Sequence, residues 1–181
     1  MRPFPDSLQT ARLILRMPDA ALASVELEMI LESLDEMWPW FPFRAKPPTV
    51  AERAELAARD RAGAASGTAA SYVVFAADRP VGRVWFDVEG TTATMGWWQR
   101  STATGHGYAT EAVLALCDLA FEFGIERVEA HTDPDNAPSR ALAERAGFGL
   151  EGIRPNAHDR PDGVRRPECI YVLLSDRRPK A

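Results

Sequence analysis

Two glycines, Gly105 and Gly107, stand where a strand pattern gives way to a helix pattern. Residues 92–98 alternate as a strand does, and apolar or small residues recur from 109 to 120 at the spacing of one buried helix face. A glycine-bearing loop before a helix offers unpaired backbone N–H groups and the positive end of the helix dipole, which together suit phosphate. The loop fits no dinucleotide pattern, because Thr110 replaces the third glycine, and it lacks the lysine of a Walker loop. It predicts an anion site and leaves the chemistry open.

Three separated stretches resemble one protein family. Residues 105–112 resemble the acetyl-CoA loop of the GCN5-related N-acetyltransferases, the GNAT superfamily, whose motif reads Arg/Gln-x-x-Gly-x-Gly/Ala. Residues 136–148 resemble the second signature of that family. Residues 8–16 resemble the first strand of the RimJ/RimL-like subgroup, which acetylates the N-termini of ribosomal proteins. The resemblance covers nearly the whole chain in the right order.

The resemblance implies an acetyl-CoA-dependent N-acetyltransferase, in which a primary amine attacks the thioester directly in a ternary complex. Within that class we favour a protein or peptide α-amine as the acceptor, by likeness to the ribosomal-protein subgroup. A small-molecule amine such as an aminoglycoside or amino acid stays open, and so does a non-catalytic acyl-CoA-binding module. No stretch has metal-ligand spacing, and no nucleophile–histidine pair indicates a covalent acyl-enzyme.

Coenzyme A contacts follow from the same resemblance. The backbone of the glycine loop would hold the diphosphate, and the end of the preceding strand would pair with the pantetheine arm and supply an N–H to the thioester carbonyl. The residues concerned are Trp98, Gln99, Arg100, Gly105, His106, Gly107, Tyr108 and Ala109. The arginine or glutamine of the family motif falls at Thr102, so Arg100 is a candidate substitute.

The second signature supplies a candidate acid. Asn136 is a candidate helix N-cap with Ser139 three positions later, and the resemblance also places Asn136 against the cofactor arm. The resemblance puts Ser139 near the sulfur, where it would protonate the leaving thiolate. Many relatives use a tyrosine at the position of Ala143, so that route is absent and Ser139 is the better candidate.

The general base is chosen among three histidines, because a base with a pKa near 7 suits removal of an amine proton. We interpret His106, in the glycine loop, and His131, near a strand end, as structural or solvent-facing. His158 aligns with the stretch where the ribosomal-protein subgroup carries an acidic base, so it is our candidate. Asp87 and Glu89 are the alternatives, and a water chain without a single base is a further one.

Residues 38–43 read Trp-Pro-Trp-Phe-Pro-Phe, a run that continues neither a helix nor a central strand. Such a rigid aromatic loop either caps the core or lines a pocket. The family places its acceptor site beside this region, which favours a pocket. We therefore expect Trp38, Trp40, Trp85 and Asp87 to bind the acceptor.

The composition indicates one domain over residues 1–181. A net charge of −5 argues against a nucleic-acid partner and suits a cationic amine. No window is apolar enough to span a membrane, and the N-terminus lacks the apolar core of a signal peptide. We interpret Cys117 and Cys169 as packed thiols and expect a cytoplasmic protein, either a monomer or a homodimer.

The periodicity predicts the order β-α-α-β-β-β-α-β-α-β-β, a mixed α/β sheet with helices on both faces. The expected strands cover residues 12–17, 71–76, 81–88, 92–98, 127–132, 148–153 and 168–174. The expected helices cover 18–37, 49–62, 105–123 and 137–146, with Thr49 and Glu52 at capping-box spacing. Residues 63–70 and the stretch after residue 153 are expected to be loops. The crossover between strands 92–98 and 127–132 makes them parallel neighbours.

Overall fold

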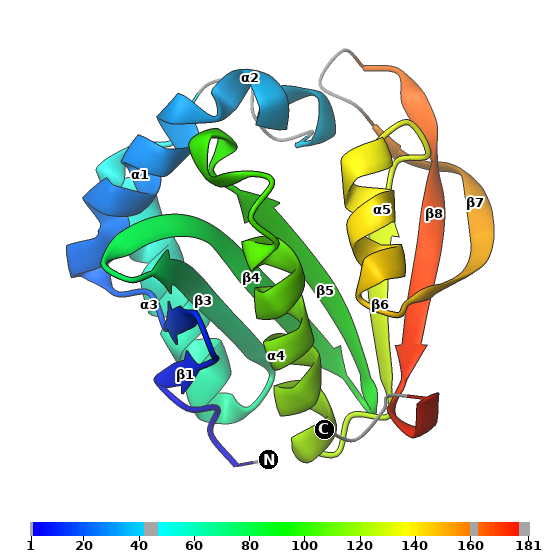
Figure 1. The fold of residues 1–181 in the computed structure, drawn as a ribbon, viewed down its shortest axis with the longest axis horizontal. Coiled ribbons are helices and arrows are strands. Elements are labelled where there is room, and N and C mark those ends of the chain that lie inside the picture. Colours follow the sequence, from blue (N-terminus) through cyan, green and yellow to red (C-terminus); the bar gives the residue numbers. More distant parts are fainter. Residues whose placement is uncertain (1, 42–46, 160–162, 178–181) are drawn as a thin grey trace.

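The computed structural model describes residues 2–41, 47–159 and 163–177. Its eight strands form one sheet in the order β1-β2-β3-β4-β5-β6-β8-β7 (Figure 1). Neighbours in the sheet are antiparallel, apart from the parallel pair β5 and β6. The strands are β1 Ser7–Gln9, β2 Leu13–Arg16, β3 Ala69–Ala76, β4 Arg79–Glu89, β5 Thr92–Gln99, β6 Arg127–Thr132, β7 Gly149–Asp159 and β8 Arg165–Leu174. The predicted mixed α/β sheet is confirmed.

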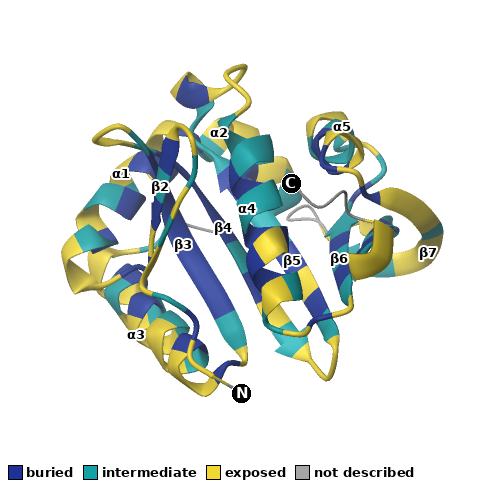
Figure 2. Cartoon of the chain, turned by 60° about the horizontal axis from the view of Figure 1, so that its bottom comes forward, coloured by how far each residue is buried: buried dark blue, intermediate teal, exposed yellow. Residues whose placement is uncertain are grey.

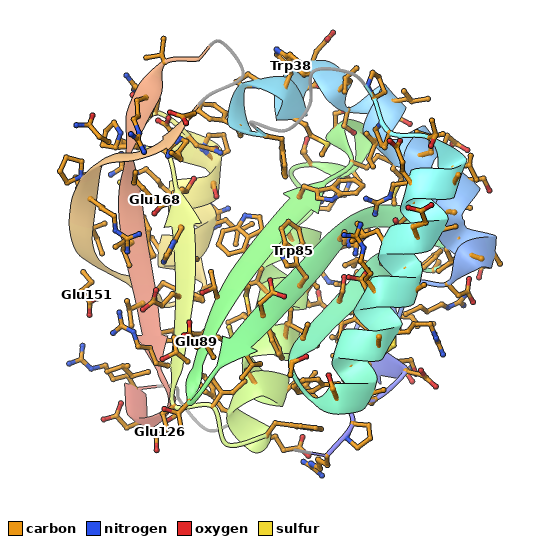
Figure 3. All side chains as sticks on the ribbon, turned by 180° about the vertical axis from the view of Figure 1, so that it is seen from behind. Trp38, Trp85, Glu89, Glu126, Glu151 and Glu168 are labelled. Atoms are coloured by element: carbon orange, nitrogen blue, oxygen red, sulfur yellow. The ribbon has the colours of Figure 1, made fainter. Side chains whose placement is uncertain are left out.

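Helices cover both faces of this sheet, as predicted. Helices α4 and α5 lie on the face seen in Figure 1, and α1 and α3 lie on the opposite face seen in Figure 3. The α-helices are α1 Ala23–Glu32, α2 Leu34–Met37, α3 Val50–Ser66, α4 Tyr108–Glu122 and α5 Ala137–Arg145. Short 3₁₀ turns are η1 Ala20–Leu22, η2 Trp38–Trp40, η3 Ser101–Ala103 and η4 Ser175–Arg177. Among the described residues, no helix combines the length and the hydropathy needed to cross a membrane.

Two apolar clusters, one on each face, hold the helices to the sheet. The larger lies under α4 and α5 and includes Tyr72, Phe86 and Leu116, all fully buried. The smaller lies under α1 and α2 and contains Met29 and Trp98. Figure 2 shows the buried central strands between these layers. Both cysteines are free and buried, which confirms packed thiols.

The helix expected over residues 18–37 is interrupted. Asp19 caps its first turn, its carboxylate accepting the N–H groups of Ala21 and Leu22, but α1 ends at Glu32 and α2 begins at Leu34. The break is at Ser33, which is fully buried and whose hydroxyl accepts the Ser101 N–H at 3.0 Å. A tertiary contact with the loop after β5 therefore accompanies a break that no proline or glycine marks in the sequence.

The capping box at Thr49 and Glu52 is confirmed, since each side chain accepts the other residue's backbone N–H. The helix is longer than predicted, however, and the expected loop 63–70 is wrong. α3 runs to Ser66 and ends at Gly67, whose φ is +74°. Gly63 lies inside this helix, where a Cβ would come within 2.9 Å of the Ala69 side chain. The absence of a side chain at Gly63 therefore lets α3 pack closely against the start of β3.

The C-terminal hairpin is also longer than predicted. β7 reaches Asp159 through an irregular register between Arg154 and His158, so His158 lies on a strand and not in a loop. The backbone of this polar stretch is held as a strand by its pairing with β8, and the polarity of its residues gave no sign of that pairing. Pro42 and Phe43 of the predicted aromatic loop lie outside the described residues.

Candidate active site

The parallel strands β5 and β6 pair only along their first halves. Their register ends at Met95 and Ala130, whereas β5 continues to Gln99 and β6 to Thr132. Figure 1 shows the two strands meeting at the lower edge of the sheet and diverging toward the upper edge. Beyond Met95, one edge of β5 therefore faces an opening instead of a neighbouring strand.

The register also decides which backbone groups of β5 face this opening. The Arg100 N–H donates to the Val81 carbonyl at 2.8 Å, on the side of β4. Because antiparallel pairs alternate, Trp98 shares this orientation, while the N–H groups of Trp97 and Gln99 point toward β6. Of the three residues expected to pair with the cofactor arm, Trp98 and Arg100 therefore turn their amides toward β4, and the amides beside the opening are those of Trp97 and Gln99.

A cleft of about 750 Å³ occupies the opening. It is lined by α4 and α5 on one side, and by η2, β4 and the ends of β6, β7 and β8 on the other. The predicted site residues that line it are Trp40, Trp85, Trp98, Gln99, Gly105, Ala109, Asn136, Ser139 and His158. Of the other predicted residues, Trp38, Asp87, Arg100, His106, Gly107 and Tyr108 do not line it.

The glycine loop presents backbone donors at the mouth of the cleft. Gly105 and Gly107 have φ values of +82° and +76°, in the left-handed region that favours glycine. Gly107 is the N-cap of α4 and provides no side-chain cap, so the first N–H groups of the helix keep their capacity for an anion. The loop therefore keeps the backbone donors on which the predicted anion site depends.

An arginine from the β1–β2 connection braces this loop from outside. Arg12 donates to the His106 carbonyl at 3.0 Å and to Glu111 at 2.7 Å. Its guanidinium lies over Tyr108, whose ring stacks with that of His106 at 5.3 Å. Arg12 thus holds the His106 backbone and the Tyr108 ring, and the His106 and Tyr108 side chains do not line the cleft.

Asn136 and Ser139 enter the cleft together from the start of α5. The Asn136 side-chain oxygen Oδ1 accepts the Ser139 N–H at 3.2 Å, which confirms the N-cap. Both residues line the same cleft as the last residues of β5, Trp97 to Gln99.

His158 lines the cleft and is paired with Asp133, a carboxylate that the sequence analysis did not single out. Its Nε2 is 3.3 Å from Asp133, whose side chain is only 3% exposed and also contacts Arg166 at 3.5 Å. The contact assigns the proton to Nε2 and the lone pair to Nδ1. Nδ1 is buried and has no hydrogen-bond partner among the described residues, so an incoming N–H donor would satisfy it.

His131 also lines the cleft, contrary to the structural or solvent-facing role expected for it. Its Nε2 is 2.8 Å from Glu129 and its Nδ1 is 3.4 Å from Glu168. Burial raises the pKa of Glu129, but hydrogen bonds from Arg127 and His131 outweigh it and leave that pKa lowered. Both His131 nitrogens are thus directed at carboxylates, whereas His158 keeps one nitrogen unengaged.

Aromatic side chains form the wall next to these histidines. Trp40, Phe41 and Trp85 line the cleft, and the Trp85 indole lies over Gly96, where a Cβ would overlap the ring. Trp38 is 37% exposed and lies at the outer end of the molecule, away from Trp85 (Figure 3). Of the four residues expected to bind the acceptor, Trp40 and Trp85 therefore line the cleft, whereas Trp38 and Asp87 do not.

Arg100 does not stand in for the family's phosphate-loop arginine. Its Nε donates to Glu32 at 2.7 Å and its Nη2 to Glu28 at 2.9 Å. Thr102, at the motif position itself, donates to Glu32 and accepts from Arg79. Both residues tie the loop to α1 instead of facing the cleft.

These bonds predict a pH-dependent stability. Hydrogen bonds from Arg100 and Thr102 lower the pKa of Glu32 from 4.5 to about 2. A carboxyl with a depressed folded-state pKa stabilises the fold above pH 4.5 and loses that effect as the pH falls toward 2. We expect Glu32→Gln to lower the melting temperature at pH 7, with a deficit that shrinks between pH 4.5 and 2.5. Thermal unfolding of both proteins across this range checks it, and a constant deficit would contradict it.

Sequence reasoning missed Asp133, Glu168 and Arg145, all of which line the cleft. Asp133 directly follows the end of β6, where side chains of parallel strands converge, and that position was its available signal. Glu168 and Arg145 carry no such signal. Among the described residues, no group of three or more His, Cys, Asp or Glu is placed to hold a metal ion.

Comparison with known proteins agrees with this architecture. Probable N-acetyltransferase YjcK of Bacillus subtilis is 41% identical over 86 residues, which is 46% of this chain and 46% of that protein. The chain thus matches about half the length of this curated relative. Mycobacterium smegmatis RimJ in complex with CoA-disulfide superposes with a TM-score of 0.92 at 26% identity, covering 100% of this chain and 93% of that one.

The RimL ribosomal L7/L12 alpha-N-protein acetyltransferase in complex with coenzyme A shares the fold, with a TM-score of 0.86 at 21% identity over 97% of this chain and 99% of that one. The sequence model of the acetyltransferase (GNAT) domain matches residues 12–149. Because that match spans well over half of the sequence, the chain belongs to the acetyltransferase (GNAT) domain family.

Proposed function

We propose that this protein is an acetyl-CoA-dependent N-acetyltransferase whose acceptor is the α-amine of a protein or peptide. The observation that carries the proposal is the exposed edge of β5 beside the uncapped start of α4, opening into one cleft. The likeness to RimJ, at 26% identity over the whole chain, supports the RimJ/RimL-like subgroup and hence a protein N-terminus. Trp40 and Trp85, with nearby carboxylates, suit a cationic amine on an apolar stem.

Backbone groups of two elements, β5 and the start of α4, would bind acetyl-CoA. Backbone groups of Trp97 and Gln99 would pair with the pantetheine arm as a strand does, and N–H groups from Tyr108 onward would hold the diphosphate. The bound acetyl-CoA supplies an activated acyl group. An N–H of the β5 edge that donates to the thioester carbonyl would lower the barrier by about 3 kcal/mol.

Two side chains that line the cleft, His158 and Ser139, carry out the proton transfers. His158 takes a proton from the amine at Nδ1, while Asp133 accepts a hydrogen bond from Nε2–H and so holds the ring in that tautomer. The amine nitrogen then forms a bond to the acyl carbon as the carbon–sulfur bond breaks. Ser139 donates its hydroxyl proton to the departing sulfur, directly or through water, giving an amide and free coenzyme A.

The proposal is tested by incubating the protein with acetyl-CoA and short peptides and measuring thiol release. Peptides with a free N-terminal Ala or Ser should react, and the same peptides with a blocked N-terminus and a free lysine should not. Turnover only on aminoglycosides or amino acids would move the acceptor to small molecules. Heat of binding with acetyl-CoA but no turnover on any amine would indicate an acyl-CoA-binding module.

Ser139→Ala is expected to lower kcat by 10- to 100-fold, because the leaving thiolate then lacks a positioned proton donor. The KM for acetyl-CoA should change less than twofold, since the hydroxyl contributes in the transition state and not in binding. Ser139→Thr keeps the hydroxyl and should retain most of the rate. Steady-state thiol release measures all three proteins, and an unchanged kcat in the alanine variant would exclude Ser139 as the acid.

A further inference from the structure

A set of hydrogen bonds outside the cleft joins the end of α1 to η3, in the loop after β5 (Figure 1). The Ser101 N–H donates to the Ser33 hydroxyl at 3.0 Å, and the Ser101 hydroxyl donates to the Glu32 carbonyl at 3.3 Å. Arg100 Nε donates to the Glu32 carboxylate at 2.7 Å, and Thr102 donates to the same carboxylate. We call the bonds from Glu32 and Ser33 to residues 100–102 the α1–η3 contact.

Each side of the α1–η3 contact leads within a few residues into the lining of the cleft. Ser33 is followed by α2 and η2, and there Trp40 and Phe41 line the aromatic wall. η3 ends at Ala103, and Gly105 of the glycine loop lines the mouth. None of the residues that make the contact lines the cleft itself. The contact therefore fixes the aromatic wall relative to the glycine loop without taking part in either surface.

Ser33 connects the two sides directly. Its φ of −109° and ψ of 13° interrupt the helix, and its carbonyl accepts the Met37 N–H at 3.0 Å in the turn that forms α2. Its side chain is fully buried, with its hydroxyl bonded to Ser101. Because one residue bonds to α2 through its carbonyl and to η3 through its hydroxyl, a displacement of η3 displaces α2 as well.

This connection has a consequence for ligand binding. Coenzyme A held by the backbone of residues 105–109 would fix the glycine loop, and η3 directly precedes that loop. We propose that the α1–η3 contact couples the two ligands, so that coenzyme A in the cleft tightens binding of the peptide acceptor at the aromatic wall. Ser33 is then a positioning residue, since it acts through α2. The coupling is reciprocal, so the acceptor tightens binding of coenzyme A by the same factor. The inference rests on the proposed function.

Calorimetric titration of the full chain with a short peptide that has a free N-terminal Ala or Ser tests the coupling. Coenzyme A, present at saturation or omitted, replaces acetyl-CoA so that no turnover occurs. In the wild type, coenzyme A should tighten peptide binding about tenfold, within the usual range for two coupled sites. In Ser33→Ala the Ser101 N–H loses its acceptor, and the factor should fall to about twofold or less. The affinity for coenzyme A alone should change little, because the glycine loop keeps its backbone donors.

A second variant removes the same hydrogen bond from its other end. Ser101→Pro deletes the N–H donor and leaves Ser33 in place, so it should lower the coupling factor as Ser33→Ala does. Proline suits the first position of a helical turn, which Ser101 occupies in η3. Ser71→Ala is the matched control. Ser71 is likewise a buried serine, 2% exposed, but its hydroxyl accepts hydrogen bonds from Arg83. Its loss should lower the melting temperature and leave the tenfold factor unchanged.

The possible outcomes separate this coupling from the proposed function. A factor that persists in both Ser33→Ala and Ser101→Pro, or that falls equally in Ser71→Ala, would overturn the role of the α1–η3 contact while leaving the proposed function intact. Equal peptide affinity with and without coenzyme A in the wild type would do the same. A wild-type protein that binds neither coenzyme A nor peptide would remove the proposed function and this inference with it.

Discussion

Replacing His158 by alanine is expected to lower kcat/KM for the acceptor about 100-fold, with little change in acetyl-CoA binding. The reason is that a positioned base contributes roughly two to four orders of magnitude to a proton transfer. His158 lines the cleft, Asp133 lies 3.3 Å from its Nε2, and its Nδ1 is buried with no partner among the described residues. Thiol release with a peptide acceptor measures the effect.

Two further readouts separate a base from a structural histidine. Added imidazole should restore part of the rate of the alanine variant, because it can enter the space left by the ring. Asp133→Asn should lower the rate about tenfold, a smaller loss than that of His158→Ala, since Asp133 positions the ring and does not touch the amine.

The other two histidines provide the controls. His106→Ala changes a side chain that stacks on Tyr108 outside the cleft, so it should retain near-normal turnover. His131→Ala changes the second histidine of the cleft, whose nitrogens both face carboxylates. A loss in His131→Ala that exceeds the loss in His158→Ala would transfer the role of base to His131.

Glu26→Gln is expected to destabilise the fold by about 3–5 kcal/mol, the usual cost of leaving a buried charge without its partner. Glu26 on α1 is 1% exposed and accepts Arg53 Nε at 2.9 Å and Arg83 Nη1 at 3.1 Å. Both arginines are 4% exposed, so the amide would leave two buried guanidinium groups short of negative charge. For a chain of this length the loss corresponds to a melting temperature roughly 10 °C lower.

The network joins α1, α3 and β4, with Asp60 and Ser71 as further partners of Arg83. Glu122→Gln removes a pair in which both side chains are more than half exposed, and should change stability by less than about 1 kcal/mol. Glu26→Gln/Arg53→Met removes one of the uncompensated charges and should recover part of the loss. Urea unfolding of the three variants measures this, and equal effects of Glu26→Gln and Glu122→Gln would be inconsistent with a buried network.

Local chemistry determined much of the architecture. Strands β5 and β6 and the helices after them lie where alternation and helical spacing placed them, because their apolar faces are buried on the core. The caps at Thr49 and Asn136 formed as predicted, since each satisfies backbone donors within three residues of itself. The glycine loop is likewise local, because positive φ at Gly105 and Gly107 depends on the residue type.

The tertiary structure decided what depends on distant partners. The break at Ser33 accompanies a bond to Ser101, and His158 joins a strand because β8 pairs with it. The Arg100 side chain points away from the cleft because it donates hydrogen bonds to Glu28 and Glu32, about 70 positions earlier in the chain. The meeting of His158 with Asp133 needed the whole sheet to be assembled. Periodicity reports which face of an element is buried, whereas the pairing of charged and polar groups is set by packing between elements, and no local pattern encodes it.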